Sequence, residues 1–229
     1  MRLRNVVLLS VLGASLLVLA RRESVADPSP ASATATASAT ATATASATVT
    51  ATATASATPK DRVLLRAREE VSRAVSYDPR WYSISYPNGD VDPTIGVCTD
   101  VVIRGYRAAG VDFQKLVHED VLRDPEAYKP WVKTPDATID HRRVGPLMTY
   151  LKRHAARLPN DDAASYQAGD VVVISFNACP ACSPQHVGIV SDKRGPRGLP
   201  LLIHNMGPTP REDDTLDAWT RIGHYRVSL

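Results

Sequence analysis

Residues 31–58 alternate Ala with Ser or Thr, interrupted once by Val49, and this run limits where the chain can fold. An alternation of apolar and polar residues has the period of a β-strand. Neither face of such a strand would carry side chains large enough to offset the entropy lost on ordering. We therefore interpret residues 27–58 as a low-complexity linker. All three Trp, eight Tyr and two Phe follow it, so the core belongs to residues 59–229, about 170 residues and enough for one domain.

The first 26 residues have the organisation of an export signal. Arg2 and Arg4 precede the apolar stretch Val6–Ala20, and Ser24-Val25-Ala26 supplies small residues for signal cleavage. The stretch is shorter than the roughly 20 residues that span a membrane, so we expect cleavage; retention as a membrane anchor is the alternative. Either outcome exports the domain, to the periplasm or the cell exterior. These residues hold four arginines and one glutamate, which accounts for the whole net charge of +3, so the charge does not indicate a nucleic-acid partner.

The hydrophobic periodicity of residues 59–229 changes from helical to strand-like near Gly169. Helices are predicted over Arg62–Val75, Gly96–Ala109, Leu116–Leu122 and Gly145–Ala156. Strands are predicted over Asp170–Phe176, His186–Asp192, Leu199–Asn205 and Ile222–Val227. A run of helices followed by a run of strands predicts an α+β fold with an antiparallel sheet.

The chain has three cysteines, Cys98, Cys179 and Cys182. Thiols of exported proteins tend to oxidise, so the Cys179-Pro-Ala-Cys182 spacing predicts a local disulfide. A thioredoxin-like redox role would require this motif to open a helix, whereas Pro184 and a strand follow it. Cys98 is then left as a candidate reactive thiol. Gly96 predicts a helix start beside it, and the N–H groups of a first helical turn stabilise a thiolate or an oxyanion; the alternative is a buried cysteine that packs like a small apolar residue.

Two histidines converge on a predicted hairpin. If the strands His186–Asp192 and Leu199–Asn205 pair across a turn near Gly195, His186 lies opposite His204 on the same face. A cysteine at a helix start and two paired histidines have the composition of a thiol–imidazole site with a third, orienting group.

The order of Cys98 at a helix start, then His186-Val-Gly-Ile-Val, then Ile203-His-Asn, resembles the NlpC-type cysteine peptidases of the papain-like superfamily. Over residues 60–227 the chain also resembles the YijF-like family, a domain of unknown function placed among papain-like relatives. The motifs that carry this likeness are Ser76–Pro79, Tyr86–Asp90, Gly96–Asp100, Lys115–Asp120, Ile139–Arg143, Gly169–Val172, His186–Asp192, Ile203–Asn205 and Gly223–Arg226.

The resemblance implies the papain-like NlpC-type fold, in which a helical first half with the cysteine at a helix N-terminus packs on an antiparallel sheet. It also implies a cysteine hydrolase that cuts amide or peptide bonds in the stem peptides of bacterial peptidoglycan. Carried over, Cys98 is the nucleophile, His186 the general base and His204 the group that orients the imidazole. Asn205 would take the orienting role if the strand register slips by one. The partner implied is peptidoglycan or another envelope peptide, with no cofactor or metal, and we expect a monomer.

Several polar residues outside this set are further candidates for orienting or binding a substrate: Tyr77, Asp100, His118, Asp140, His141 and Arg142. One hypothesis is that Arg142 or Arg143 binds a carboxylate of a stem peptide. The alternative is structural, with a capped helix end and an ion pair between the segments around His118 and Asp140. A separate hypothesis is that Tyr77, Tyr82 and Tyr86 line a cleft before Cys98; the alternative is that these aromatic rings pack in the core.

Three other functions use the same residues. Cys179, Cys182, His186 and His204 have ligand types and spacing that would suit zinc, although export favours the disulfide. A papain-like acyltransferase would need the same cysteine and histidines. A cell-wall-binding module would keep the fold without the reaction.

Overall fold

The computed structural model describes residues 57–229. The predicted signal peptide, 1–26, and all but the last two residues of the predicted linker, 27–58, lie outside the described residues. The α-helices are α2 (Pro59–Ser72), α3 (Cys98–Ala108), α4 (Phe113–Arg123), α5 (Pro125–Tyr128) and α6 (Val144–His154), and short 3-10 helices cover Asp140–Arg142 and Ala163–Ser165. The strands are β1 (Ser76–Tyr77), β2 (Ile95–Gly96), β3 (Ala156–Arg157), β4 (Val171–Ser175), β5 (His186–Arg194), β6 (Pro200–Asn205), β7 (Pro210–Asp213) and β8 (Thr220–Arg226).

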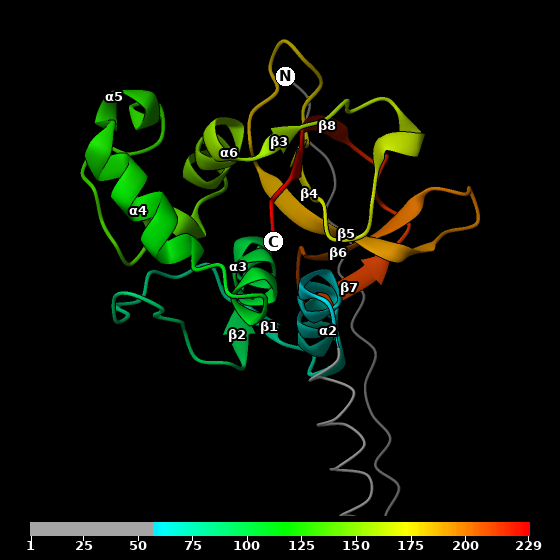
Figure 1. Cartoon of the computed structure of the whole chain (residues 1–229), viewed down its shortest axis with the longest axis horizontal. Coiled ribbons are helices and arrows are strands. Elements are labelled where there is room, and N and C mark those ends of the chain that lie inside the picture. Colours follow the sequence, from blue (N-terminus) through cyan, green and yellow to red (C-terminus); the bar gives the residue numbers. More distant parts are fainter. Residues whose placement is uncertain (1–56) are drawn as a thin grey trace, which may run out of the picture. The chain divides into compact units, whose positions relative to one another are not determined.

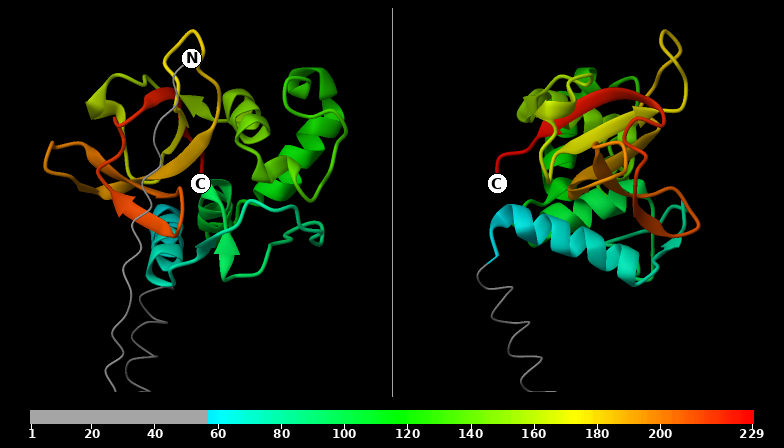
Figure 2. Two further views of the ribbon diagram at one scale, coloured as in Figure 1. Left: turned by 180° about the vertical axis from the view of Figure 1, so that it is seen from behind. Right: turned by 90° about the vertical axis from the view of Figure 1, so that its right-hand side faces the viewer.

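A six-stranded sheet in the order β3-β8-β4-β5-β6-β7 forms the second half of the domain, and all neighbouring strands are antiparallel. Helices α2 and α3 pack against one face, with α3 on β5 and β6 and α2 on β5 and β7 (Figure 1). The side view in Figure 2 shows both helices beneath the strands. Helices α4, α5 and α6 pack on one another beside α3. The predicted α+β class with an antiparallel sheet is confirmed.

Helix α3 is the central helix of the domain. Its first nine residues, Cys98–Tyr106, are all buried, as expected of a helix with neighbours on every side. The buried Arg104 is neutralised by Glu70 of α2, at 2.6 Å, and by Asp90, at 2.9 Å. The helix begins at Cys98, two residues later than predicted, because Ile95–Gly96 forms β2 and pairs with β1.

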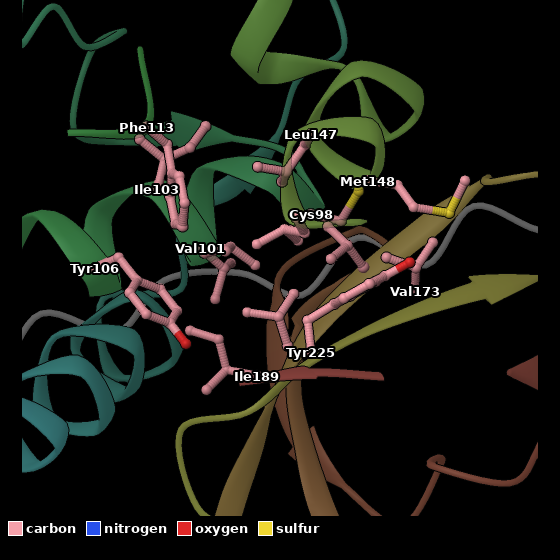
Figure 3. Packing of buried hydrophobic residues seen from close by; sticks show 14 of the residues in the cluster. Cys98, Val101, Ile103, Tyr106, Phe113, Leu147, Met148, Val173, Ile189 and Tyr225 are labelled. Carbon is pink, nitrogen blue, oxygen red and sulfur yellow. The ribbon is translucent and has the colours of Figure 1, made fainter. Parts of the chain in front are cut away.

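Side-chain alternation divides the apolar residues of the sheet between two clusters. Val173, Ile189 and Tyr225 face the helices and pack against α3 and α6 side chains in the larger cluster (Figure 3). Ile174, Val190 and Leu202 belong to a smaller cluster with Leu216 and Tyr166. Cys98 belongs to the larger cluster. Alternate residues of a strand face the same side of the sheet, so His186 of β5 lies on the side of Val190 and His204 of β6 on the side of Leu202.

The predicted hairpin register is wrong by two residues. Ile189 pairs with Ile203, so Gly188 rather than His186 lies opposite His204. The reason is the position of the turn. Arg194 pairs with Pro200, so the turn is centred near residue 197 rather than Gly195, and the irregularity between Val190 and Arg194 reduces the difference from four residues to two. A shift of two residues keeps both histidines on one face. No helix within residues 57–229 is long and apolar enough to cross a bilayer.

Candidate active site

Cys98 is the first residue of α3 and the free cysteine among the described residues. The preceding residue, Val97, is extended and caps the helix without a side-chain hydrogen bond. Its N–H donates instead to Asp100 Oδ2, at 2.7 Å. The Cys98 side chain therefore lies at the positive end of the α3 dipole, where the free N–H groups of the first turn point toward it.

Burial dominates the acidity of this thiol. Cys98 is only 6% exposed, and loss of solvation raises the pKa of the thiol to about 12. The backbone N–H groups of Val187, Thr99 and Cys98 itself act in the opposite direction by stabilising the thiolate, while the charge of Asp100 adds to the rise. At neutral pH the resting side chain is therefore a thiol rather than a thiolate.

Three titratable side chains form a hydrogen-bonded chain across β5, β6 and β7. His186 Nε2 lies 2.8 Å from His204 Nδ1, and His204 Nε2 lies 3.0 Å from Asp213 Oδ1. The hydroxyl of Thr215 donates to the same Asp213 oxygen, at 2.7 Å. His186 and His204 are buried, and their rings meet edge to face.

Burial also sets the charge of this chain. It lowers the pKa of His186 to about 3, with the neighbouring His204 adding to the effect. Burial lowers the pKa of His204 as well, against the hydrogen bond to Asp213. Burial raises the pKa of Asp213, but the hydrogen bonds from Thr215 and His204 outweigh it and bring that pKa below its usual range. The resting state is two neutral imidazoles and one carboxylate.

Cys98 lies beside the start of β5. Gln185 lines the same pocket as Cys98, and the Val187 N–H is close enough to stabilise the thiolate. His186 is the residue between these two. Among residues 57–229 no hydrogen bond joins the Cys98 thiol to either histidine, and His186 Nδ1 is the ring nitrogen that His204 leaves free. Bonds of this kind often form only when substrate binds.

A pocket of about 280 Å³ opens beside Cys98. The residues that line it include Tyr77, Trp81, Arg142 and Arg143. Burial raises the pKa of Tyr77, and the negative charges of Asp100 and of an ionised Cys98 raise it further, so its phenol stays protonated beside the thiol. Cys98, Tyr77 and Arg143 therefore border one pocket.

Arg142 and Asp100 form a buried, bidentate ion pair with two contacts of 2.9 Å. Both side chains are 3% exposed. Arg142 therefore borders the pocket, but its guanidinium is already paired with the Asp100 carboxylate. Thr99 strengthens the connection because its hydroxyl donates to the Arg142 carbonyl, at 2.9 Å. The neighbouring Arg143 makes no ion pair with any carboxylate of residues 57–229. Of the two arginines, Arg143 has the guanidinium that a ligand could reach.

His118 and Asp140 contact each other rather than the pocket. His118 Nδ1 lies 2.9 Å from Asp140 Oδ2, which also accepts the Asp136 N–H. Burial raises the pKa of Asp140. His141 is 1% exposed, its Nδ1 has no hydrogen-bond partner among the described residues, and burial lowers its pKa to about 3. The contact between His118 and Asp140 is the one expected if these two segments have a structural role rather than a role in substrate binding.

Asn205 lies next to the segment that leads into Cys98. Its Nδ2 donates to the Gly96 carbonyl, at 3.3 Å, and its Oδ1 accepts the Gly207 N–H. His204 rather than Asn205 contacts His186.

Cys179 and Cys182 form a disulfide in the loop between β4 and β5. The bond occupies both sulfurs that a zinc site would require. No group of three or more His, Cys, Asp or Glu side chains within residues 57–229 is arranged to hold a metal ion.

Four members of the site escaped the sequence analysis: Trp81, Gln185, Asp213 and Thr215. Asp213 ends β7, a strand of four residues whose sequence, Pro-Arg-Glu-Asp, has no apolar alternation. The sequence did contain one indication of Asp213: it is a polar residue shortly after Ile203-His204-Asn205, close enough in sequence for its strand to form a hairpin with the strand of His204.

Residues 64–227 match the family described as a domain of unknown function, DUF1287. The chain is 44% identical over 163 residues to the uncharacterized protein YijF of Escherichia coli (strain K12), a match that covers 70% of this chain and 78% of that protein. A crystal structure of an N-acetylmuramoyl-L-alanine amidase from Bacteroides uniformis is similar over 75% of this chain and 99% of that chain, with 13% sequence identity and a TM-score of 0.41.

Proposed function

The chain belongs to the DUF1287 family of domains of unknown function, in agreement with the YijF-like resemblance of its motifs, and we propose that it is an exported cysteine hydrolase of papain-like, NlpC type. Its substrate would be an amide bond in the stem peptides of peptidoglycan. The observation that carries this proposal is the position of Cys98. Cys98 starts helix α3, borders a pocket and lies beside strand β5. The first residue of that strand, His186, is hydrogen-bonded to His204, which is hydrogen-bonded to Asp213.

In the reaction we propose, the thiol and imidazole are both neutral until substrate binds. His186 Nδ1 takes the thiol proton as Cys98 Sγ bonds to the carbonyl carbon, and the carbonyl electron pair moves to its oxygen. The N–H groups of the first turn of α3 stabilise that oxyanion. When the pair returns, the C–N bond breaks and His186 gives its proton to the leaving amine. Water then attacks the thioester with His186 as base, which releases the acid and restores the thiol.

Peptidoglycan is the proposed substrate for two reasons. The predicted export signal places the domain where cell wall is found, and the NlpC-type motifs imply that substrate class. The pocket supports a carboxylated peptide, since Arg143, one of its lining residues, is exposed and forms no ion pair with a carboxylate of residues 57–229. Stem peptides carry free carboxylates, and guanidinium groups bind them with two parallel hydrogen bonds.

The test is to incubate the purified chain with peptidoglycan digests and to identify the products by mass spectrometry. We expect new amine and carboxyl termini from the wild type and a rate at least about 1,000-fold lower from Cys98→Ala. Arg143→Ala is expected to raise KM for carboxylated fragments and to leave kcat nearly unchanged. Cys179→Ser with Cys182→Ser is the matched control for loss of sulfur. Cleavage by Cys98→Ala at the wild-type rate would rule the mechanism out.

The burial of Cys98 favours one second candidate, a cell-wall-binding module that has kept the fold. A thiol that is 6% exposed with a pKa raised to about 12 is a poor nucleophile at rest. For this candidate we expect the wild type and Cys98→Ala to sediment equally with intact peptidoglycan and to release no fragment. An acyltransferase would instead join an added amine to the acyl fragment, which the same mass spectra detect.

A further inference from the structure

We propose that Asp213 is a positioning residue that fixes the proton positions on both histidines, so that Nδ1 of His186 is unprotonated and able to act as the base for Cys98. This inference rests on the proposed function for its catalytic meaning. It depends on geometry that the sequence motifs do not contain, because Asp213 lies on β7, outside the motifs that carry the family resemblance.

The donor and acceptor roles in the two hydrogen bonds follow from the ionised carboxylate of Asp213. An ionised carboxylate only accepts hydrogen bonds, so the contact of 3.0 Å requires His204 Nε2 to carry a proton. A neutral imidazole has one proton, so His204 Nδ1 is an acceptor. The contact of 2.8 Å between Nδ1 of His204 and Nε2 of His186 then requires a proton on His186 Nε2. His186 Nδ1 is left with a free electron pair, as a general base requires.

The surroundings of Asp213 keep it in this role. Thr215 donates its hydroxyl proton to Asp213 Oδ1, at 2.7 Å, and Arg211 Nε lies 3.6 Å from the other oxygen. Arg211 pairs with His204 in the β6–β7 register, so Asp213 lies two residues further along the same face. The charged and titratable groups that face His204 are therefore His186 from β5 and Arg211 and Asp213 from β7.

Both imidazoles are neutral at pH 7, since burial lowers the pKa of each, and the hydrogen bonds to Asp213 keep its carboxyl ionised. Only one arrangement of protons then satisfies every contact, including the 3.2 Å contact of His204 Nε2 with Thr215 Oγ1, where the hydroxyl accepts from the imidazole while it donates to Asp213. An asparagine at position 213 can turn its NH₂ toward His204 Nε2. That contact would reverse the donor and acceptor roles in both hydrogen bonds, so that His204 Nδ1 donates to His186 Nε2. The proton of His186 would then lie on Nδ1, which could no longer accept the thiol proton of Cys98.

The experiment reads the tautomers directly. ¹⁵N spectra of histidine-labelled protein at pH 7, assigned with His204→Gln, distinguish Nε2–H from Nδ1–H imidazoles. We expect Nε2–H at both positions in the wild type and a population of Nδ1–H in Asp213→Asn. Asp214→Asn is the matched control because the next carboxylate faces Arg197, at 3.0 Å, instead of a histidine. Nδ1–H at His204 in the wild type would overturn the inference, and this spectrum is decisive even if Asp213→Asn does not fold.

Turnover supplies the second measurement. We expect Asp213→Asn to lower kcat about 10- to 100-fold with KM within about twofold, a smaller effect than the roughly 10⁴-fold loss known for a buried triad aspartate. The difference follows from the 33% exposure of the Asp213 side chain. Wild-type activity in a folded Asp213→Asn would also overturn the inference. Nε2–H tautomers in a protein that cleaves nothing would uphold the proton arrangement and refute the proposed function, so the two failures are distinguishable.

Discussion

At the scale of single residues, burial decides the protonation of the groups around the site. Cys98, His186 and His141 have neighbours of different charge, yet loss of solvation is the largest cause of each pKa shift. All three are therefore neutral at pH 7. A cysteine protease with a permanent thiolate–imidazolium pair would need the opposite balance. The resting thiol and both imidazoles of this site are instead neutral, and Asp213 is its ionised member.

His141 gives a testable consequence for stability. Its folded pKa is about 3 and its unfolded pKa about 6.5, so between these values the unfolded chain binds one more proton. Stability contributed by neutral His141 is present above pH 6.5 and is lost as the pH falls. We expect about 2–3 kcal/mol of this loss by pH 4.5. His141→Gln should make the pH dependence of the unfolding free energy shallower over this range, as measured by urea denaturation at several pH values.

A surface histidine separates this effect from general acid denaturation. His154→Gln alters a side chain that is 37% exposed and should leave most of the acid-induced loss in place. An unchanged slope for His141→Gln would mean that residue 141 takes up no proton on unfolding.

At the scale of elements, the N-terminus of α3 is held by a carboxylate and a guanidinium from different segments. Asp100 accepts the Val97 N–H and both contacts from Arg142. The segment that precedes α6 is thereby fixed to the helix that begins with Cys98. Asp170 has a similar role at the other end of the sheet, where it contacts His224 and Arg226 of β8. These contacts explain why charged residues occur in motifs outside the candidate catalytic set.

Asp100→Asn tests this anchoring. The variant leaves the buried Arg142 charge without its partner, which destabilises a protein by about 3–5 kcal/mol. We expect a loss of that size in the free energy of unfolding from urea titration. Glu126→Gln is the control because its ion pair with Lys129 is about 70% exposed and worth less than about 1 kcal/mol. Equal losses in the two variants would show that the α3 anchor contributes no more than a surface pair.

The elements also differ in how far the sequence could predict them. The apolar stripe of residues 62–75 and the β-branched runs of β4 to β6 each have a clear period, and they form the predicted helix and strands with shifts of a few residues. Strands β1, β2, β3 and β7 have two to four residues each, too few for a period to show. Asp213 was missed for this reason, since its strand is defined by pairing with β6 rather than by its own residues. The contact of Asp140 with His118 likewise depends on how distant segments pack.

At the scale of the whole molecule, the described domain starts with its own helix cap. Thr58 and Asp61 form a reciprocal capping box, in which Asp61 N–H donates to Thr58 Oγ1, at 3.2 Å, and Thr58 N–H donates to Asp61 Oδ2, at 3.0 Å. Pro59 occupies the first turn, where its missing N–H is not needed. The predicted boundary at residue 59 thus has a local physical cause just before α2. The domain boundary itself stays a prediction.

We expect a chain that begins at Ala55 to unfold with the same free energy, within about 0.5 kcal/mol, as a chain that begins at Asp27, because an Ala/Ser/Thr segment has no side chains that could add to a core. A chain that begins at Asp61 loses Thr58 and the capping box, so it should be less stable by about 1 kcal/mol. Urea denaturation of the three chains at one pH measures both differences. A loss above about 1 kcal/mol on removing residues 27–54 would mean that the linker packs on the domain, and the domain would then have to be extended toward the N-terminus.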